Sequence, residues 1–209
     1  VAVEIDRALA QLLRERWGND PRFTLVERDV LQVPLAEVAG EDFVLAGNVP
    51  YYITTPILFH ALERPRARRA VYLVQKEVAE RVVAPPGGKA YGALSVNVQA
   101  IAAGELLFRV PPGAFNPPPK VDSAVLRVTP LAEPLVLPAE ERGFSSFVQE
   151  VFGLRRKQLR RVVRTVAHLD AEGGEAVVAR AGLDPEARPE VLSPRELVAL
   201  YRELSPRRA

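Results

Sequence analysis

Short apolar runs alternate with amphipathic stretches from Val1 to Val83, as expected where strands alternate with helices. The predicted strands cover residues 1–5, 23–27, 43–46 and 70–74. Asp6 can cap a helix whose apolar stripe runs from Leu9 to Trp17, and further helices are predicted over 56–62 and 76–83. This alternation predicts an α/β fold with parallel strands.

After Gly92 the apolar runs follow one another without long helices between them. They predict strands over 94–101, 105–110 and 123–128, and the turn-rich segment 111–122 separates the last two. We expect an antiparallel hairpin that closes the sheet and makes it mixed.

Beyond the proline-rich stretch 131–138 the pattern becomes helical, with apolar residues at helical spacing in 144–152 and 159–166. Ser193-Pro-Arg-Glu196 is a capping box with proline at the first helical position, which predicts a last helix. We therefore expect a small helical domain over residues 139–209 after an α/β domain over residues 1–132.

The composition excludes several kinds of chemistry. The 209 residues carry a net charge of +2 and include no Cys, which excludes disulfides, cysteine-ligated zinc, iron–sulfur clusters and thiol catalysis. With two histidines in the chain, no metal site and no histidine-dependent triad is expected. The cations are 24 Arg and 4 Lys, which fits either codon bias or phosphate recognition by the guanidinium group.

Neither a signal peptide nor a membrane span is predicted. No charged segment precedes an apolar stretch at the start, and polar residues and prolines interrupt the uncharged stretch 43–62. A cytoplasmic protein without membrane contact is the expectation.

Polar residues stand where three of the predicted strands end: Glu4, Asp29 and Asn48. In parallel sheets, ligands bind at the carboxyl ends of strands. The three side chains are therefore expected to line one crevice.

Asn48-Val49-Pro50-Tyr51 is the sharpest chemical motif. After a buried strand, the Asn48 side-chain oxygen and the Val49 carbonyl can accept both N–H bonds of a planar amino group, which turns the nitrogen lone pair outward as a nucleophile. Pro50 fixes the turn, and Tyr51 offers a face on which a base can stack. Four residues alone are equally compatible with an ordinary turn and a buried tyrosine.

A run of cations without an acid precedes and enters the predicted helix around residue 160. Its apolar stripe would leave these cations on the outer face, which suits RNA phosphates or is simply a solvated basic face. The six cations expected on this one helix are Arg155, Arg156, Lys157, Arg160, Arg161 and Arg164.

Four blocks in this order closely resemble the KsgA family of small-subunit ribosomal RNA adenine N6-dimethyltransferases. They are Asn48-Val-Pro-Tyr-Tyr-Ile-Thr-Thr-Pro56, Val74-Gln-Lys-Glu-Val-Ala-Glu-Arg81, Lys89-Ala-Tyr-Gly92 and Val110-Pro-Pro-Gly-Ala-Phe-Asn-Pro-Pro-Pro-Lys-Val-Asp-Ser-Ala124. The resemblance covers nearly the whole chain. It implies a Rossmann-like class I methyltransferase with a mixed sheet, followed by RNA-binding helices.

The resemblance also implies the cofactor, S-adenosyl-L-methionine, and the role of each site residue. Glu4 would bind the cofactor ribose hydroxyls, with Ile5 against its adenine. Asp29 would accept from the adenine amino group, with Val30 beside it. Asn48 would also touch the cofactor. Phe115 would pack on the target base opposite Tyr51, so the catalytic set is Asn48, Val49, Pro50, Tyr51 and Phe115.

The implied function is N6,N6-dimethylation of two adjacent adenosines near the 3′ end of small-subunit (16S) ribosomal RNA. The expected partner is that RNA in a pre-ribosomal particle, bound by a monomer during ribosome biogenesis. Two alternatives stay open: an Erm-type enzyme acting on large-subunit RNA, and a non-catalytic RNA-binding assembly factor.

The chain departs from the family at its start. Family members have a first strand and a Gly-rich loop before the residue that matches Glu4, and the sequence begins after them. We expect this N-terminally truncated chain to leave two strand edges unpaired and to bind the cofactor poorly.

Overall fold

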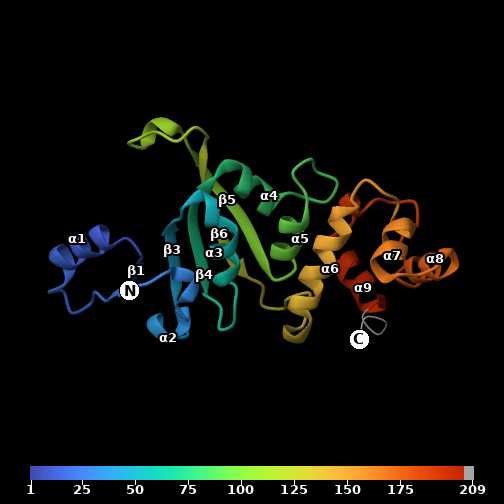
Figure 1. Cartoon of the computed structure of the whole chain (residues 1–209), viewed down its shortest axis with the longest axis horizontal. Coiled ribbons are helices and arrows are strands. Elements are labelled where there is room, and N and C mark those ends of the chain that lie inside the picture. The colour runs from blue at the N-terminus through green and yellow to red at the C-terminus, as the bar shows by residue number, and fades with distance from the viewer. Residues whose placement is uncertain (205–209) are drawn as a thin grey trace. The chain divides into compact units, whose positions relative to one another are not determined.

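The computed structural model describes residues 1–204, which divide into two compact units, Val1–Val74 and the chain from Gln75 onward (Figure 1). The functional division expected between residues 132 and 139 stays a prediction. The first unit holds two parallel strand pairs, and the second holds an antiparallel pair with most of the helices. The fold class is mixed α/β, as predicted.

In the first unit, β1 (Ala2–Glu4) pairs with β2 (Leu25–Glu27), and β3 (Val44–Asn48) pairs with β4 (Arg69–Gln75). The predicted strands are confirmed, with β3 running two residues further than expected, so that Asn48 is its last residue. The helices of this unit are α1 (Arg7–Trp17), α2 (Leu35–Ala39) and α3 (Thr54–His60), with short 3-10 turns η1 (Val30–Gln32) and η2 (Tyr51–Ile53).

Local sequence explains where α1 begins. The Asp6 carboxylate accepts hydrogen bonds from the backbone N–H groups of Ala8 at 2.8 Å and Leu9 at 3.0 Å, which satisfies two donors that the first turn leaves free. The predicted cap is therefore confirmed. Because α1 follows Glu4 after two residues, the cap also fixes the chain directly beyond the β1 end.

The second unit begins with α4 (Lys76–Val83) and α5 (Ala93–Gln99), followed by the hairpin of β5 (Ala102–Val110) and β6 (Ser123–Pro130). The predicted hairpin is confirmed, and Leu107 forms a bulge in it, because Leu106 and Phe108 oppose consecutive residues of β6. Helix α4 lies directly against β5, since a Cβ at Gly104 would stand 2.7 Å from a Val82 methyl. Glycine at this position is what permits the close approach.

The prediction of a strand over 94–101 is wrong, because α5 occupies this segment. Leu94, Val96 and Val98 alternate with the polar residues Ser95, Asn97 and Gln99, which is the period of a strand, yet all five residues Leu94–Val98 are buried in the helix. The Ser95 side chain stabilises the start of this helix. Its hydroxyl accepts from the Gly92 N–H at 3.1 Å and donates to the Arg81 carbonyl, which ties the start of α5 to α4.

Four helices follow the proline-rich stretch and gather in one group, orange to red in Figure 1. They are α6 (Glu141–Gly153), α7 (Leu159–Ala167), α8 (Ala171–Arg180) and α9 (Pro194–Leu204), with the 3-10 turns η3 (Pro112–Ala114), η4 (Pro138–Glu140) and η5 (Pro189–Val191) elsewhere in the unit. Phe144, Phe147 and Tyr201 pack ring against ring between α6 and α9. The capping box is confirmed, since Ser193 and Glu196 exchange hydrogen bonds.

None of the helices in residues 1–204 is long and apolar enough to cross a membrane.

Candidate active site

Glu4 and Asp29 lie at the same end of the β1–β2 pair. Glu4 is opposite Glu27 in the parallel register, and Asp29 follows two residues later. One carboxylate oxygen of Glu4 accepts from the Asp6 N–H at 2.8 Å, and one of Asp29 accepts from the Leu31 N–H at 3.0 Å. Each carboxylate is thus held in place by one oxygen and keeps the other for a ligand.

One exposed and one half-buried apolar side chain lie next to these acids in the sequence. Ile5 is 66% exposed, and Val30 is half-buried. An exposed isoleucine beside a partly buried carboxylate is a surface that an apolar ring can cover. This end of the strand pair therefore combines acceptors with an apolar platform.

The end of β3 presents the predicted amino-group acceptors. Asn48 lies opposite Leu73 of β4 and is exposed, whereas Val49 is 8% exposed. Within residues 1–204, neither the Asn48 side chain nor the Val49 carbonyl has a hydrogen-bond partner. The two oxygens predicted to accept one amino group are both unoccupied by protein donors.

The turn that follows is fixed by its own hydrogen bonds. The Thr54 hydroxyl lies 3.3 Å from the Pro50 carbonyl and 3.2 Å from the Tyr51 carbonyl, and the Ile53 N–H donates to Pro50 at 3.2 Å. These bonds use the Pro50 and Tyr51 carbonyls and leave that of Val49 aside. Tyr51 is half-buried at the start of η2, so the motif is a defined turn with a partly exposed ring.

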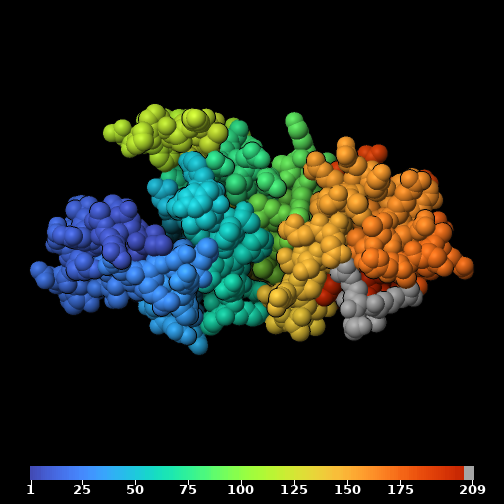
Figure 2. Space-filling view, in the orientation of Figure 1, coloured from blue at the N-terminus to red at the C-terminus, as the bar shows by residue number. Residues whose placement is uncertain are grey.

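Phe115 belongs to the second unit, where it ends η3 within the loop of residues 111–122. Figure 1 shows this loop extending away from the β5–β6 hairpin, and it forms a separate lobe in Figure 2. Phe115 is half-buried, and the Asn116–Pro117 peptide bond after it is cis. The stacking role implied for Phe115 remains a prediction.

The six predicted RNA-binding cations do not lie on one helix. Arg155, Arg156 and Lys157 are exposed on the turn between α6 and α7, because α6 ends at Gly153 and α7 begins only at Leu159. Backbone hydrogen bonds between residues three apart shape this turn. One of them runs from the Lys157 N–H to the Leu154 carbonyl at 2.8 Å. We call residues 155–157 the basic turn.

The α7 cations also differ from one another. Arg161 and Arg164 are exposed, but Arg160 lies 3.7 Å from Glu175 of α8 and 3.5 Å from Glu186. Helix α8 comes close enough for the Glu175 pair because Gly174 faces α7, where a Cβ would meet the Arg164 stem at 2.4 Å. The expectation of a basic face free of acids therefore fails at Arg160, because α8 supplies one acid and the segment after α8 supplies the other.

Both histidines have structural surroundings. The His60 ring bridges the Val33 carbonyl at 2.9 Å and Glu63 at 3.0 Å, and His168 is the left-handed residue that ends α7. Residues 1–204 contain no group of three or more His, Asp or Glu side chains that could hold a metal ion.

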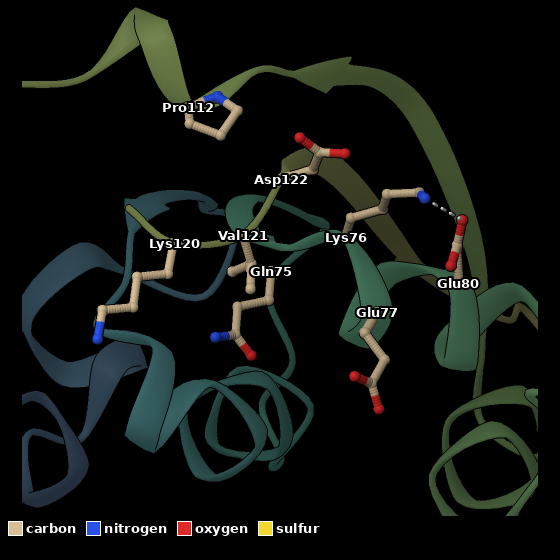
Figure 3. A pocket seen from close by; sticks show the side chains of 8 residues that line it. All are labelled: Gln75, Lys76, Glu77, Glu80, Pro112, Lys120, Val121 and Asp122. Carbon is tan, nitrogen blue, oxygen red and sulfur yellow. Dashed lines mark ion pairs between the residues drawn. The ribbon is translucent and has the colours of Figure 1, made fainter. Parts of the chain in front are cut away.

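Sequence reasoning did not single out a cavity beneath the 111–122 loop. Its polar lining includes Gln75, Glu77, Lys120 and Asp122, which come from two segments far apart in the sequence (Figure 3). Both segments lie within blocks that carry the family resemblance, which is the signal that could have drawn attention to them.

Acceptors at the carboxyl ends of parallel strands, followed by an Asn-Val-Pro-Tyr turn with its own hydrogen bonds, form the arrangement that the sequence predicts for an α/β methyltransferase. Residues 1–204 match the family model described as ribosomal RNA adenine dimethylase. The chain belongs to this family and is therefore an enzyme of the rRNA adenine dimethyltransferase type.

Two curated relatives carry the name Ribosomal RNA small subunit methyltransferase A. The protein of Synechococcus sp. (strain JA-3-3Ab) is 47% identical over 96% of this chain and 71% of its own length. That of Acinetobacter baylyi is 42% identical over 98% of this chain and 73% of its own.

Two solved structures share the fold. The 23S rRNA methyltransferase ErmE is 28% identical with a TM-score of 0.70, over 97% of this chain and 80% of its own. A dimethyladenosine transferase from Plasmodium falciparum is 23% identical with a TM-score of 0.82, over 98% and 81%. The relatives at 42–47% identity favour the small-subunit enzymes over the Erm type.

Proposed function

We propose that the protein transfers methyl groups to N6 of two adjacent adenosines near the 3′ end of small-subunit ribosomal RNA. It would act as a cytoplasmic monomer on an immature small subunit. The observation that carries the proposal is the pair of unoccupied acceptors, Asn48 and Val49, at the end of β3. The names of the relatives support the choice of small-subunit RNA.

The carboxylates and apolar side chains at the β1–β2 end fit S-adenosyl-L-methionine. The carboxylate of Glu4 has an oxygen left for ribose hydroxyls, and that of Asp29 has one for an adenine amino group. Ile5 and Val30 offer apolar contact to the adenine ring. When bound, this cofactor supplies an electrophilic methyl group.

The residues of the turn orient the target amino group. The Asn48 oxygen and the Val49 carbonyl accept its two N–H bonds, so the lone pair points out of the ring plane toward the methyl donor. Tyr51 and Phe115 would hold the flipped base between their rings. The nitrogen would become cationic as it takes the methyl group from the sulfonium sulfur, which keeps the electron pair of the broken S–C bond, and the nitrogen would then lose its proton to water. No general base is therefore needed in advance.

The helices of residues 139–209 would bind the RNA, and residues 1–132 would carry out methyl transfer. The basic turn, together with Arg161 and Arg164, offers five exposed cations to phosphates. Arg160 contributes less to this surface, because Glu175 and Glu186 already neutralise it.

Methylation of undermethylated small subunits tests the proposal. Asn48→Ala is expected to lower kcat by about 100-fold or more, because a preorganised acceptor for the reacting nitrogen is lost, while particle binding persists. Asn19→Ala is the matched control, since Asn19 is exposed in a turn outside the site. Full activity of Asn48→Ala would refute the site. Preferred methylation of large subunits would favour the Erm type, and particle binding without methylation by the unaltered protein would favour the assembly-factor alternative.

A further inference from the structure

A cavity of about 510 Å³ lies between the first turn of α4 and the 111–122 loop, entirely within the second unit. Figure 3 shows the side chains of Pro112 and Asp122 on the loop side, and those of Gln75 and Glu77 on the α4 side. The volume lies within the range of pockets that hold small organic ligands, about 300–1,000 Å³. The site is thus large enough for one nucleotide.

The frame of this cavity is preformed. The Lys76 N–H donates to the Asp122 carbonyl at 2.9 Å, which joins α4 to the end of the loop. Glu80 lies 3.5 Å from Lys76 and 3.5 Å from Arg109 of β5, which joins the same helix to the strand that leads into the loop. Both ends of the loop are therefore anchored on α4, and the cavity walls do not need to form when a ligand binds.

Four polar side chains around the cavity have no hydrogen-bond or ion-pair partner within residues 1–204: Gln75, Glu77, Lys120 and Asp122. Lys76 and Glu80, in contrast, are paired with each other. The available groups are therefore two carboxylates, one amide and one ammonium group. Together they can accept N–H bonds at two or more positions and can donate to one anionic group.

This donor set specifies the chemistry of a ligand. Two carboxylates repel a phosphate on its own, but they accept from the exocyclic amino group of a nucleobase, and the Gln75 amide can pair with a base edge. Lys120 can hold the phosphate attached to that base. Val121, which is 44% exposed, and Pro112 provide apolar contact for the base.

We infer that this cavity binds an unstacked nucleotide of the substrate RNA next to the target adenosine, through the exocyclic amino group of its base. That the bound nucleotide belongs to the substrate RNA rests on the proposed function. Two connections along the chain link its residues to those of the target site. Asn48 is opposite Leu73 of β4, and Gln75 follows two residues later on the same strand. Phe115 lies on the loop that also carries Lys120 and Asp122.

Titration with adenosine 5′-monophosphate tests binding without relying on methyl transfer. The chain has four lysines, so ¹⁵N-lysine labelling gives few amide signals, two of which line the cavity. We expect the Lys76 and Lys120 signals to shift and that of Lys89 to stay. Glu77→Gln combined with Asp122→Asn should weaken this response roughly tenfold, since each carboxylate bond to a base edge counts for discrimination. Both side chains lack partners, so the variant should fold normally.

Two further ligands show which part of the nucleotide the cavity recognises. Purine riboside 5′-monophosphate lacks the amino group and should bind about tenfold more weakly. Equal shifts with inorganic phosphate would reduce the site to an anion site and overturn the inference. So would an absence of Lys76 and Lys120 shifts up to about 10 mM nucleotide, because weaker binding carries too little free energy to position RNA.

A second test measures KM and kcat of methyl transfer to undermethylated small subunits. The Glu77→Gln, Asp122→Asn variant should raise KM about tenfold with kcat nearly unchanged, because uniform binding is lost. Glu133→Gln, which changes an exposed acid in the proline-rich stretch outside both the methyl-transfer and the RNA-binding segments, is the matched control. An unchanged KM would contradict the inference. If the unaltered protein shows the lysine shifts yet methylates no RNA, the proposed function fails and the nucleotide site stands.

Discussion

Two tyrosine hydroxyls are buried to nearly the same degree, but their surroundings differ. Tyr72 is 1% exposed and Tyr91 is 2% exposed. The Tyr91 hydroxyl donates to the Leu192 carbonyl at 2.8 Å, whereas that of Tyr72 has no partner within residues 1–204. Burial raises the pKa of both phenols, and the charge of Glu196 adds to this for Tyr91. A buried hydroxyl without a partner costs free energy, so the two residues contribute to stability in opposite ways.

The pair yields a prediction for stability. Tyr91→Phe should lower the free energy of unfolding by about 1–2 kcal/mol, because the Leu192 carbonyl loses its donor. Tyr72→Phe should leave it unchanged or raise it by up to about 1 kcal/mol, because it removes an unpaired polar group. Urea unfolding measures both. A loss from Tyr72→Phe as large as that from Tyr91→Phe would show that Tyr72 does have a partner, such as a bound water.

At the scale of elements, one ion pair joins segments that are far apart in the sequence. Two nitrogens of Arg202 in α9 donate to the two carboxylate oxygens of Glu140 in η4, at 2.9 and 2.8 Å, and one also donates to the Leu135 carbonyl at 3.0 Å. Such forked pairs hold geometry better than single bonds. The contact fixes the start of α6 against the last helix.

This pair predicts a pH-dependent contribution to stability. Hydrogen bonds from Arg202 hold the pKa of Glu140 below its ordinary value of 4.5. The stabilisation is therefore complete above that value and is lost as the pH falls through the lowered pKa. Glu140→Gln should reduce the free energy of unfolding at pH 7 by about 0.5–1 kcal/mol, since the pair is partly exposed, and by nearly nothing once the carboxyl is protonated.

Urea unfolding across this pH range, with Glu37→Gln as a control that breaks no ion pair, checks the prediction. A Glu140→Gln difference that persists at the acidic end would mean that shape, not charge, holds η4 to α9.

At the scale of the whole molecule, a net charge of only +2 hides an uneven distribution. Many arginines outside the basic turn are paired with acids, including Arg14 with Glu27 and Arg180 with Glu203. The three cations of the basic turn have no acid partner within residues 1–204. RNA phosphates would thus meet three neighbouring cations that no acid neutralises, although the total charge is small.

Salt dependence tests this distribution. Replacing Arg155, Arg156 and Lys157 with Gln should weaken RNA binding and reduce the slope of log affinity against log salt by about 2–3, because each phosphate contact contributes about 0.7–0.9. Arg22→Gln should change the slope little, since Asp20 already neutralises Arg22 at 2.8 Å. Fluorescence anisotropy with small-subunit RNA gives both slopes. A triple variant with the slope of the unaltered protein would place the RNA elsewhere.

Much of the fold and part of the site could be predicted because their signals are local. Asp6 and the Ser193–Glu196 box cap helices through atoms two or three residues away, so sequence spacing is enough to identify them. The strand ends at Glu4 and Asn48 follow equally from short apolar runs. Segment 94–101 was assigned wrongly, because apolar and polar residues alternate there with the period of a strand, whereas tertiary packing buries both sets in a helix.

By itself, the amino-acid sequence determined the order of the elements, the acceptors at the strand ends and the family to which the chain belongs, since ordered motifs and local periodicity carry all three. Only the tertiary structure decided that Arg160 is paired, that Tyr72 and Tyr91 differ, and that Gln75, Glu77, Lys120 and Asp122 surround one cavity. The physical reason is that ion pairing, burial and cavities depend on the atoms that folding brings together from distant parts of the chain.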